Sequence, residues 1–141
     1  SAANPRSESL KNGLAISYSK LGSVWQSLGK LDKALEFFEK RSKLGEELSA
    51  ANPRSESLKN GLAISYYKLA GIYEAKGDLA KAFEYYSKDT QLTEEAWQNN
   101  PHSAQLKKYV AISYRQMSSI LKKMGKQKEA AAWFSKADDV K

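Results

Sequence analysis

The sequence predicts an all-α fold, an α-solenoid (superhelix) of three antiparallel helix hairpins. Three observations carry this prediction. The dipeptide Asn-Pro recurs at a constant interval, at 4–5, 52–53 and 100–101, and residues 2–18 reappear letter for letter as residues 50–66. Each unit contains two stretches with helical apolar periodicity. Self-similarity at a fixed period of this size is typical of stacked repeat proteins, in which each unit buries its apolar face against its neighbours.

The first helix of each unit is predicted to begin at its proline, at Pro5, Pro53 and Pro101. Asparagine is a good N-cap, proline is tolerated at the first helical position, and the residue before proline is disfavoured in helical conformation. Apolar residues then recur every three or four positions, which predicts one buried stripe per helix. The stripes are Leu10, Leu14, Tyr18, Leu21, Trp25 and Leu28; Leu58, Leu62, Tyr66, Leu69 and Tyr73; and Leu106, Val110, Tyr114, Met117, Leu121 and Met124.

Each first helix is expected to end near a glycine, at Gly29, Gly77 or Gly125, because glycine suits the left-handed residue that closes a helix. The first helices would then have about 24 residues and a length of about 36 Å. A second amphipathic pattern follows each glycine. It is carried by Leu31, Ala34, Leu35 and Phe38; by Leu79, Ala82, Phe83 and Tyr86; and by Lys126, Ala130, Ala131 and Phe134. The short turns predict that neighbouring helices run antiparallel.

The spacing of these residues resembles that of the tetratricopeptide repeat family. In the first unit, Tyr18, Leu21-Gly22 and Trp25 are followed by Ala34 and Phe38, as in that family's pattern. The family repeat has about 34 residues, so these 48-residue units resemble the extended repeats of long bacterial members. The resemblance implies one repeat domain over residues 1–141, with repeats at 5–52, 53–100 and 101–141. In place of the family's small residue late in the second helix stand Arg41 and Asp89, whereas Ala137 fits.

The polar helix that often closes arrays of this family is missing after the third repeat, which is therefore interpreted as truncated. Trp133 and Phe134 in the last predicted helix are then expected to be partly uncovered. Uncovered apolar ends of repeat arrays favour self-association. Self-assembly through these ends is accordingly one hypothesis for this chain.

Composition limits the classes of function. With 41% hydrophobic and 28% charged residues, the chain has the composition of a folded domain. No apolar run is long enough to span a membrane and no signal-peptide pattern is present, which favours a cytoplasmic location. The absence of cysteine excludes disulfides, thiolate metal sites and cysteine nucleophiles. The net charge of +7 is concentrated in residues 101–141, with nine basic and three acidic residues.

No set of residues indicates catalysis, a cofactor or a metal. The single histidine, His102, is interpreted as a solvated residue near a helix start, because general-base chemistry needs a nucleophile and an orienting acid beside it. The acidic pairs Glu46-Glu47 and Glu94-Glu95 are interpreted as solvated surface, since adjacent residues point to different faces of a helix. No glycine-rich phosphate loop occurs. The sequence therefore predicts a protein that is not an enzyme.

The resemblance implies a concave groove lined by the first helix of each repeat, where relatives bind peptides or partner segments. The groove residues predicted here are Asn12, Ser19, Ser23, Asn60, Tyr67, Lys108, Arg115, Ser119 and Lys122. They change from neutral polar to basic along the chain, which favours a protein or peptide partner with an acidic segment near the third repeat. The alternative is that these are ordinary exposed side chains.

A second alternative rests on the third repeat, which is rich in lysine at positions 107, 108, 122, 123, 126 and 128. Such a patch could bind the phosphates of nucleic acid. Lysine outnumbers arginine, however, and no RNA-binding motif is present. The sequence therefore favours a scaffold for protein interactions over one associated with nucleic acid.

Overall fold

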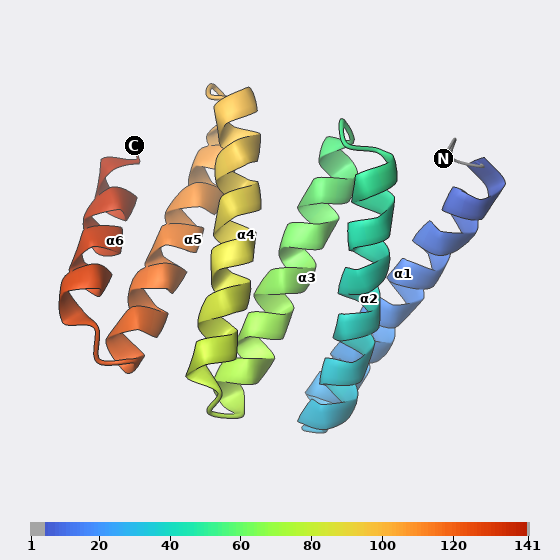
Figure 1. Ribbon diagram of the computed structural model, residues 1–141, viewed down its shortest axis with the longest axis horizontal. Coiled ribbons are helices and arrows are strands. Elements are labelled where there is room, and N and C mark those ends of the chain that lie inside the picture. Colours follow the sequence, from blue (N-terminus) through green and yellow to red (C-terminus); the bar gives the residue numbers. More distant parts are fainter. Residues whose placement is uncertain (1–4, 141) are drawn as a thin grey trace.

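The computed structural model describes residues 5–140 and places six helices there in a row, in the order of the chain (Figure 1). They are α1 (Pro5–Ser27), α2 (Leu31–Ala51), α3 (Glu56–Ala75), α4 (Leu79–Asn99), α5 (Ala104–Lys123) and α6 (Gln127–Asp139). These residues contain no strand, and none of their helices is long and apolar enough to cross a membrane. The predicted all-α fold of sequential hairpins is confirmed.

The turn inside each hairpin is closed by a glycine, as predicted. Gly29, Gly77 and Gly125 have φ angles of 74°, 85° and 80°, a region that favours glycine. In the first turn, the N–H of Gly29 donates to the carbonyl of Gln26 at 3.0 Å, and that of Lys30 to the carbonyl of Trp25 at 2.9 Å. The same pair of bonds recurs at the other two glycines. The three first helices therefore end in Schellman motifs.

The start of α3 differs from the prediction. Pro53 was expected to open this helix, yet the helix begins at Glu56 and its N-cap is Ser55, whose Oγ accepts a 3.2 Å bond from the N–H of Leu58. Asn52 is instead the C-cap of α2. The Asn-Pro dipeptide therefore lies in the turn between hairpins. The same correction holds in the next repeat, where Pro101 precedes α5, the helix begins at Ala104 and Ser103 is its N-cap.

This correction shortens the first helices of the later hairpins. Both α3 and α5 have 20 residues and are shorter than predicted, whereas α1 begins at Pro5 as predicted and has 23. Asn4, the predicted N-cap of α1, lies outside the described residues. The Asn52 side chain has a different function, because its Nδ2 donates to both carboxylate oxygens of Glu8, at 3.0 and 3.2 Å. The turn after α2 is thus tied to the first turns of α1.

The core is continuous along the row because each helix packs against the helix before and the helix after it in the chain. The cluster that joins α2 to α3 consists of Ala34, Phe38, Leu62, Tyr66, Leu69 and Ile72. A second cluster joins α3 to α6 and consists of Ala70, Ala82, Tyr86, Met117, Ile120, Leu121 and Ala130. The apolar stripes predicted for α3 and α5 supply five of these thirteen residues, namely Leu62, Tyr66, Leu69, Met117 and Leu121.

The stripe predicted for α1 is not a core stripe. Leu14 is 44% exposed, whereas Leu62 at the same position of α3 is 5% exposed. Leu62 and Leu69 pack against α2, and no described helix precedes α1 to cover its leucines in the same way. Leu21 is exposed for the same reason, since its counterpart Leu69 is fully buried. Leu10 and Leu28 are exposed as well.

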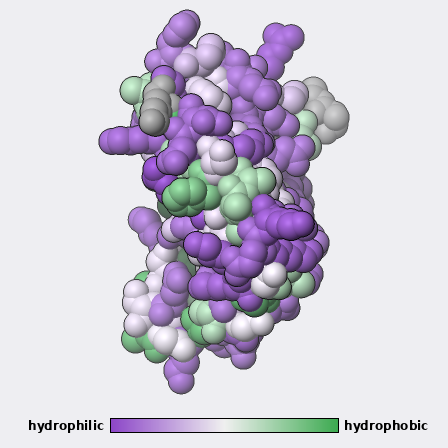
Figure 2. Space-filling model, turned by 90° about the vertical axis from the view of Figure 1, so that its left-hand side faces the viewer, coloured by the Kyte–Doolittle hydropathy of each residue, from purple (hydrophilic) through white to green (hydrophobic). Residues whose placement is uncertain are grey.

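The opposite end of the row is also partly uncovered, as predicted. On α6, Phe134 is 54% exposed, whereas Phe38 at the same position of α2 is fully buried. Trp133 is half-buried, because its ring packs on that of Tyr114 with a centroid separation of 5.5 Å. Green hydrophobic patches interrupt a mainly hydrophilic surface at this end of the molecule (Figure 2).

Candidate functional site

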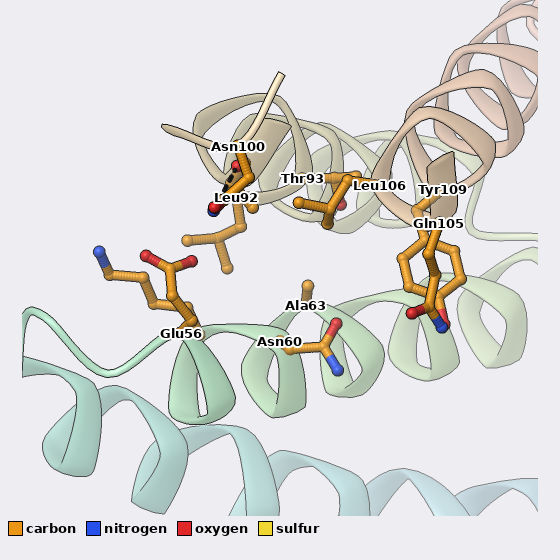
Figure 3. Close-up of a pocket in the computed structure, with 11 residues that line it drawn as sticks. Glu56, Asn60, Ala63, Leu92, Thr93, Asn100, Gln105, Leu106 and Tyr109 are labelled. Carbon is orange, nitrogen blue, oxygen red and sulfur yellow. Dashed lines mark hydrogen bonds between the residues drawn. The ribbon is translucent and has the colours of Figure 1, made fainter. Parts of the chain in front are cut away.

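Two adjoining pockets form a groove between α3 and α5, with α4 as its floor. The first, which we call the end pocket, has a volume of about 200 Å³ and is shown in Figure 3. It is lined by Glu56, Lys59, Asn60, Ala63, Leu92, Thr93, Ala96, Asn100, Gln105, Leu106 and Tyr109. The second, the Asp89 pocket, has a volume of about 310 Å³. It is lined by Asn60, Ala63, Ile64, Tyr67, Asp89, Thr93, Tyr109, Ile112 and Ser113.

Asp89 is the only acidic residue that lines its pocket, and it is 8% exposed. Its Oδ1 accepts a hydrogen bond of 3.2 Å from Thr93 Oγ1, which also donates to the Asp89 backbone carbonyl at 2.9 Å. Burial raises the pKa of the Asp89 carboxyl to about 7, and the bond from Thr93 opposes part of the rise. No cation among residues 5–140 pairs with this carboxylate.

The walls of the Asp89 pocket are aromatic and aliphatic. Tyr67 on α3 and Tyr109 on α5 are both partly exposed, as are Ile64 and Ile112. The hydroxyl of Tyr109 accepts a 2.7 Å hydrogen bond from Nε2 of Gln105, one turn earlier on the same helix. Exposed apolar side chains that gather around a concavity are typical of binding sites.

The corresponding place over α2 carries the opposite charge. Arg41 stands one repeat before Asp89, and its guanidinium lies between Gly45 of α2 and Gly61 of α3. A Cβ at Gly45 would lie 2.6 Å from Nη1, and one at Gly61 would lie 2.7 Å from Nη2. Glycine at both positions therefore makes room for the arginine. Nη1 is buried without a hydrogen-bond partner, and burial lowers the Arg41 pKa.

A comparison with protein families identifies part of this architecture. Residues 63–94, from the middle of α3 into α4, match the family model described as a tetratricopeptide repeat. This segment is therefore similar to a tetratricopeptide repeat. Repeats of this kind are typically scaffolds for protein–protein interaction, and the family is generally non-catalytic.

Solved structures also resemble this chain. One of them is described as the crystal structure of MamA. The two chains are 21% identical, the match covers 89% of this chain and 77% of the other, and the TM-score is 0.43. A comparison with curated proteins gave no match.

Of the predicted groove residues, the structure brings Asn60 and Tyr67 together in the Asp89 pocket. The other seven do not line either pocket of the groove. On α1, Asn12 is exposed and Ser19 and Ser23 are half-buried. On α5, Lys108, Arg115, Ser119 and Lys122 are all exposed. Three of these four are basic, and they supply the basic surface beside the groove.

Sequence reasoning missed most of the pocket lining, although the signals were present. Ile64 and Ile112 repeat Ile16 at the same place in successive units and stand outside the predicted apolar stripes. Tyr109 replaces the glycines at positions 13 and 61. Asp89 was noted as a departure from the family pattern, but its position in a pocket depends on how α3 and α5 flank α4.

Two other expectations from the sequence concern charged surface residues. Glu46 and Glu94 were interpreted as solvated surface; Glu46 is exposed and Glu94 is half-buried, and each also accepts a hydrogen bond from a tyrosine of the following hairpin. Lys123, one of the lysines counted toward a nucleic-acid surface, forms an ion pair with Glu74. His102 is exposed. Within residues 5–140, no three histidine or acidic side chains gather in a way that could hold a metal ion.

Proposed function

We propose that this protein is a non-catalytic scaffold that binds a peptide or an extended partner segment in the groove lined by the first helices of its hairpins. The observation that carries the proposal is the concavity between α3 and α5. The side chains that line it include exposed Ile64, Tyr67, Tyr109 and Ile112, and none of these four belongs to the hydrophobic core. Large exposed apolar side chains in a concave site contribute binding energy when a partner covers them.

The partner segment is expected to contain an acidic stretch that lies beside α5. Lys108, Arg115 and Lys122 are exposed on that helix, and α1 offers neutral Asn12, Ser19 and Ser23 in the equivalent region. Charge complementarity of this kind steers association and fixes the register of the bound segment. The groove residues Asn60 and Tyr67 would provide hydrogen bonds and contact area, as would Ser119, which is exposed on α5 outside both pockets.

Selection from a displayed peptide library, with the whole chain immobilised, tests the groove directly. Ile64→Asp places a charge in the Asp89 pocket, and Ile16→Asp makes the same change at the equivalent exposed position of α1, outside both pockets. We expect enriched peptides to bind the wild type and Ile16→Asp alike, and Ile64→Asp at least tenfold more weakly. If the peptides bind the wild type and both variants equally, the groove over α4 is not the binding site and the proposal is wrong.

Self-association is a second candidate, supported by a specific observation at the two ends. Exposed Leu14 and Leu21 of α1 and exposed Phe134 of α6 stand at the positions that form the buried α2–α3 interface inside the chain, where Leu62, Leu69 and Phe38 lie. If the α1 of one copy packed against the α6 of another, both exposed apolar faces would be buried, as they are at the α2–α3 interface. Light scattering at two protein concentrations should then show mass that rises with concentration, and Leu14→Glu should abolish the rise. Constant monomer mass would exclude this candidate.

A further inference from the structure

We infer that the Asp89 pocket receives a lysine or arginine side chain of the bound segment, with the Asp89 carboxylate as its counter-ion. This inference rests on the proposed function and names the chemistry of one ligand residue. The bound segment would then have a basic residue over α4 in addition to the acidic stretch expected beside α5.

The first argument is the unpaired state of Asp89. A buried carboxylate without a cation is unfavourable, and the only side-chain partner of Asp89 among residues 5–140 is the hydroxyl of Thr93. The other side chains that line the pocket are uncharged on α3 and on α5; they are Asn60, Ala63, Ile64, Tyr67, Tyr109, Ile112 and Ser113. A basic side chain from a ligand would give the carboxylate a charge-assisted hydrogen bond, which would replace the hydration that the carboxylate loses by burial.

The second argument is the lining above the carboxylate. Ile64 and Ile112 offer apolar surface for the methylene stem of a lysine or arginine. Tyr67 and Tyr109 line the same pocket, and a cation placed over the face of a tyrosine ring is stabilised. A small acidic side chain would be repelled by the carboxylate, and a small neutral one would leave its charge unpaired. The combination therefore favours a long cationic side chain.

The third argument is the contrast with the place over α2. There Arg41 presents a cation that has no ion-pair partner among the described residues, and a basic ligand side chain would be repelled. Because the two equivalent places carry opposite charges, a segment with one basic residue gains its ion pair over α4 alone. The groove thereby distinguishes one register of the segment from a register shifted by one hairpin.

A titration of the ¹⁵N-labelled full chain, followed by NMR, tests the pocket with small probes. The cationic probe is Nα-acetyl-arginine methylamide, and its neutral, nearly isosteric match is Nα-acetyl-citrulline methylamide. We expect the arginine probe to shift amide signals around Tyr67, Asp89 and Tyr109 and to bind at least tenfold more tightly than the citrulline probe. Equal binding of the two probes, or no shifts at the pocket with the arginine probe, would overturn the inference.

Variants assign the preference to the carboxylate. Asp89→Asn should remove the advantage of arginine over citrulline, whereas Asp138→Asn, at an exposed acid of α6, should leave it unchanged. An advantage that survives in Asp89→Asn contradicts the inference. If that variant does not fold, Tyr109→Ala serves instead, since loss of one aromatic wall should weaken the arginine probe more than the citrulline probe. A uniform effect on both probes counts against the pocket.

The library selection separates this inference from the proposed function. Peptides that depend on Ile64 and lose at least tenfold in affinity when one lysine or arginine is replaced by glutamine support both. Peptides that depend on Ile64 but tolerate that replacement overturn the basic-residue pocket and leave the groove in place. A selection with no dependence on Ile64 overturns both.

Discussion

The hydroxyl of Tyr66 on α3 donates a hydrogen bond of 2.6 Å to Oε2 of Glu46 on α2, in the preceding hairpin. Lys88, from the other helix of its own hairpin, lies 5.4 Å from the centre of the Tyr66 ring. The same trio recurs one repeat later, where Tyr114 donates to Glu94 at 2.6 Å and Lys136 lies 4.9 Å from its ring. Each tyrosine therefore joins two successive hairpins.

The first prediction concerns this tyrosine contact. Tyr66→Phe keeps the ring but removes the hydroxyl, so we expect a loss of about 0.5–1.5 kcal/mol in the free energy of unfolding. Tyr109→Phe is the matched control, because the Tyr109 hydroxyl accepts its hydrogen bond from Gln105 of its own helix. Urea unfolding of both variants, followed by circular dichroism, measures the difference. Equal stability of the two variants would show that the bond to Glu46 contributes nothing.

The second prediction compares two leucines that occupy the same position in successive hairpins. Leu62 is buried against α2, so Leu62→Ala should cost about 2–5 kcal/mol in unfolding free energy. Leu14 is largely uncovered, so Leu14→Ala should cost less than about 1 kcal/mol in the monomer. Urea unfolding at a concentration where light scattering gives monomer mass checks both. A Leu14→Ala penalty as large as that of Leu62→Ala would mean that something covers α1.

These two leucines also show what periodicity can and cannot predict. The spacing of apolar residues predicted correctly which face of each helix is apolar, because an amphipathic helix repeats about every 3.6 residues. It could not predict what covers that face. Leu62 and Leu14 have identical local sequences, and only the position of the hairpin in the row decides that one is buried and the other exposed.

The helix ends were predictable to different degrees. The glycines that end the first helices were identified correctly, since few other residues adopt the left-handed conformation without strain. The prediction that helices begin at Pro53 and Pro101 was wrong, because each of these regions contains an asparagine before the proline and a serine after it that could serve as the N-cap. Asparagine and serine both cap well, and the proline between them fits a turn as readily as a first helical turn.

The pocket was the least predictable feature. Asp89 and Arg41 could be recognised as unusual at their positions, but not as buried groups without ion partners. That property depends on which side chains of α3 and α5 lie opposite them. Tyr109 beside Asp89, and Gly61 beside Arg41, are brought there by the packing of separate helices.

The third prediction concerns two glycines of α1. A Cβ at Gly22 would lie 2.9 Å from the ring of Phe38, which is fully buried, so Gly22→Ala should destabilise the protein by about 1–3 kcal/mol. Gly13 has no atom within 4 Å of the same position and lies in the helix interior. Gly13→Ala should therefore stabilise by about 0.5–1 kcal/mol. Thermal unfolding of the two variants gives the sign of each change, and the same sign for both would contradict the packing of α1 on α2.

The last prediction concerns pH and Asp89. Burial raises the pKa of this carboxyl from its ordinary value of 3.8 to about 7 in the folded state. The folded protein therefore binds more protons than the unfolded chain between these values, and stability is lost as pH rises from about 4 to about 7. The groups that face Asp89 are Thr93 and Tyr86 on α4, Asn60 and Tyr67 on α3, and Tyr109 and Ser113 on α5, and none of them is a carboxylate, a histidine, a lysine or an arginine.

Asp89→Asn isolates this contribution, because the amide keeps the size of the side chain and does not titrate. Relative to the variant, the wild-type protein should lose about 2–3 kcal/mol of unfolding free energy as the pH rises from about 5 to about 8. Urea unfolding at several pH values measures the difference, and other titrating groups cancel in the comparison. A difference that stays constant with pH would mean that the Asp89 carboxyl is ionised normally, and the desolvated pocket that defines the basic-residue site would lose its electrostatic basis.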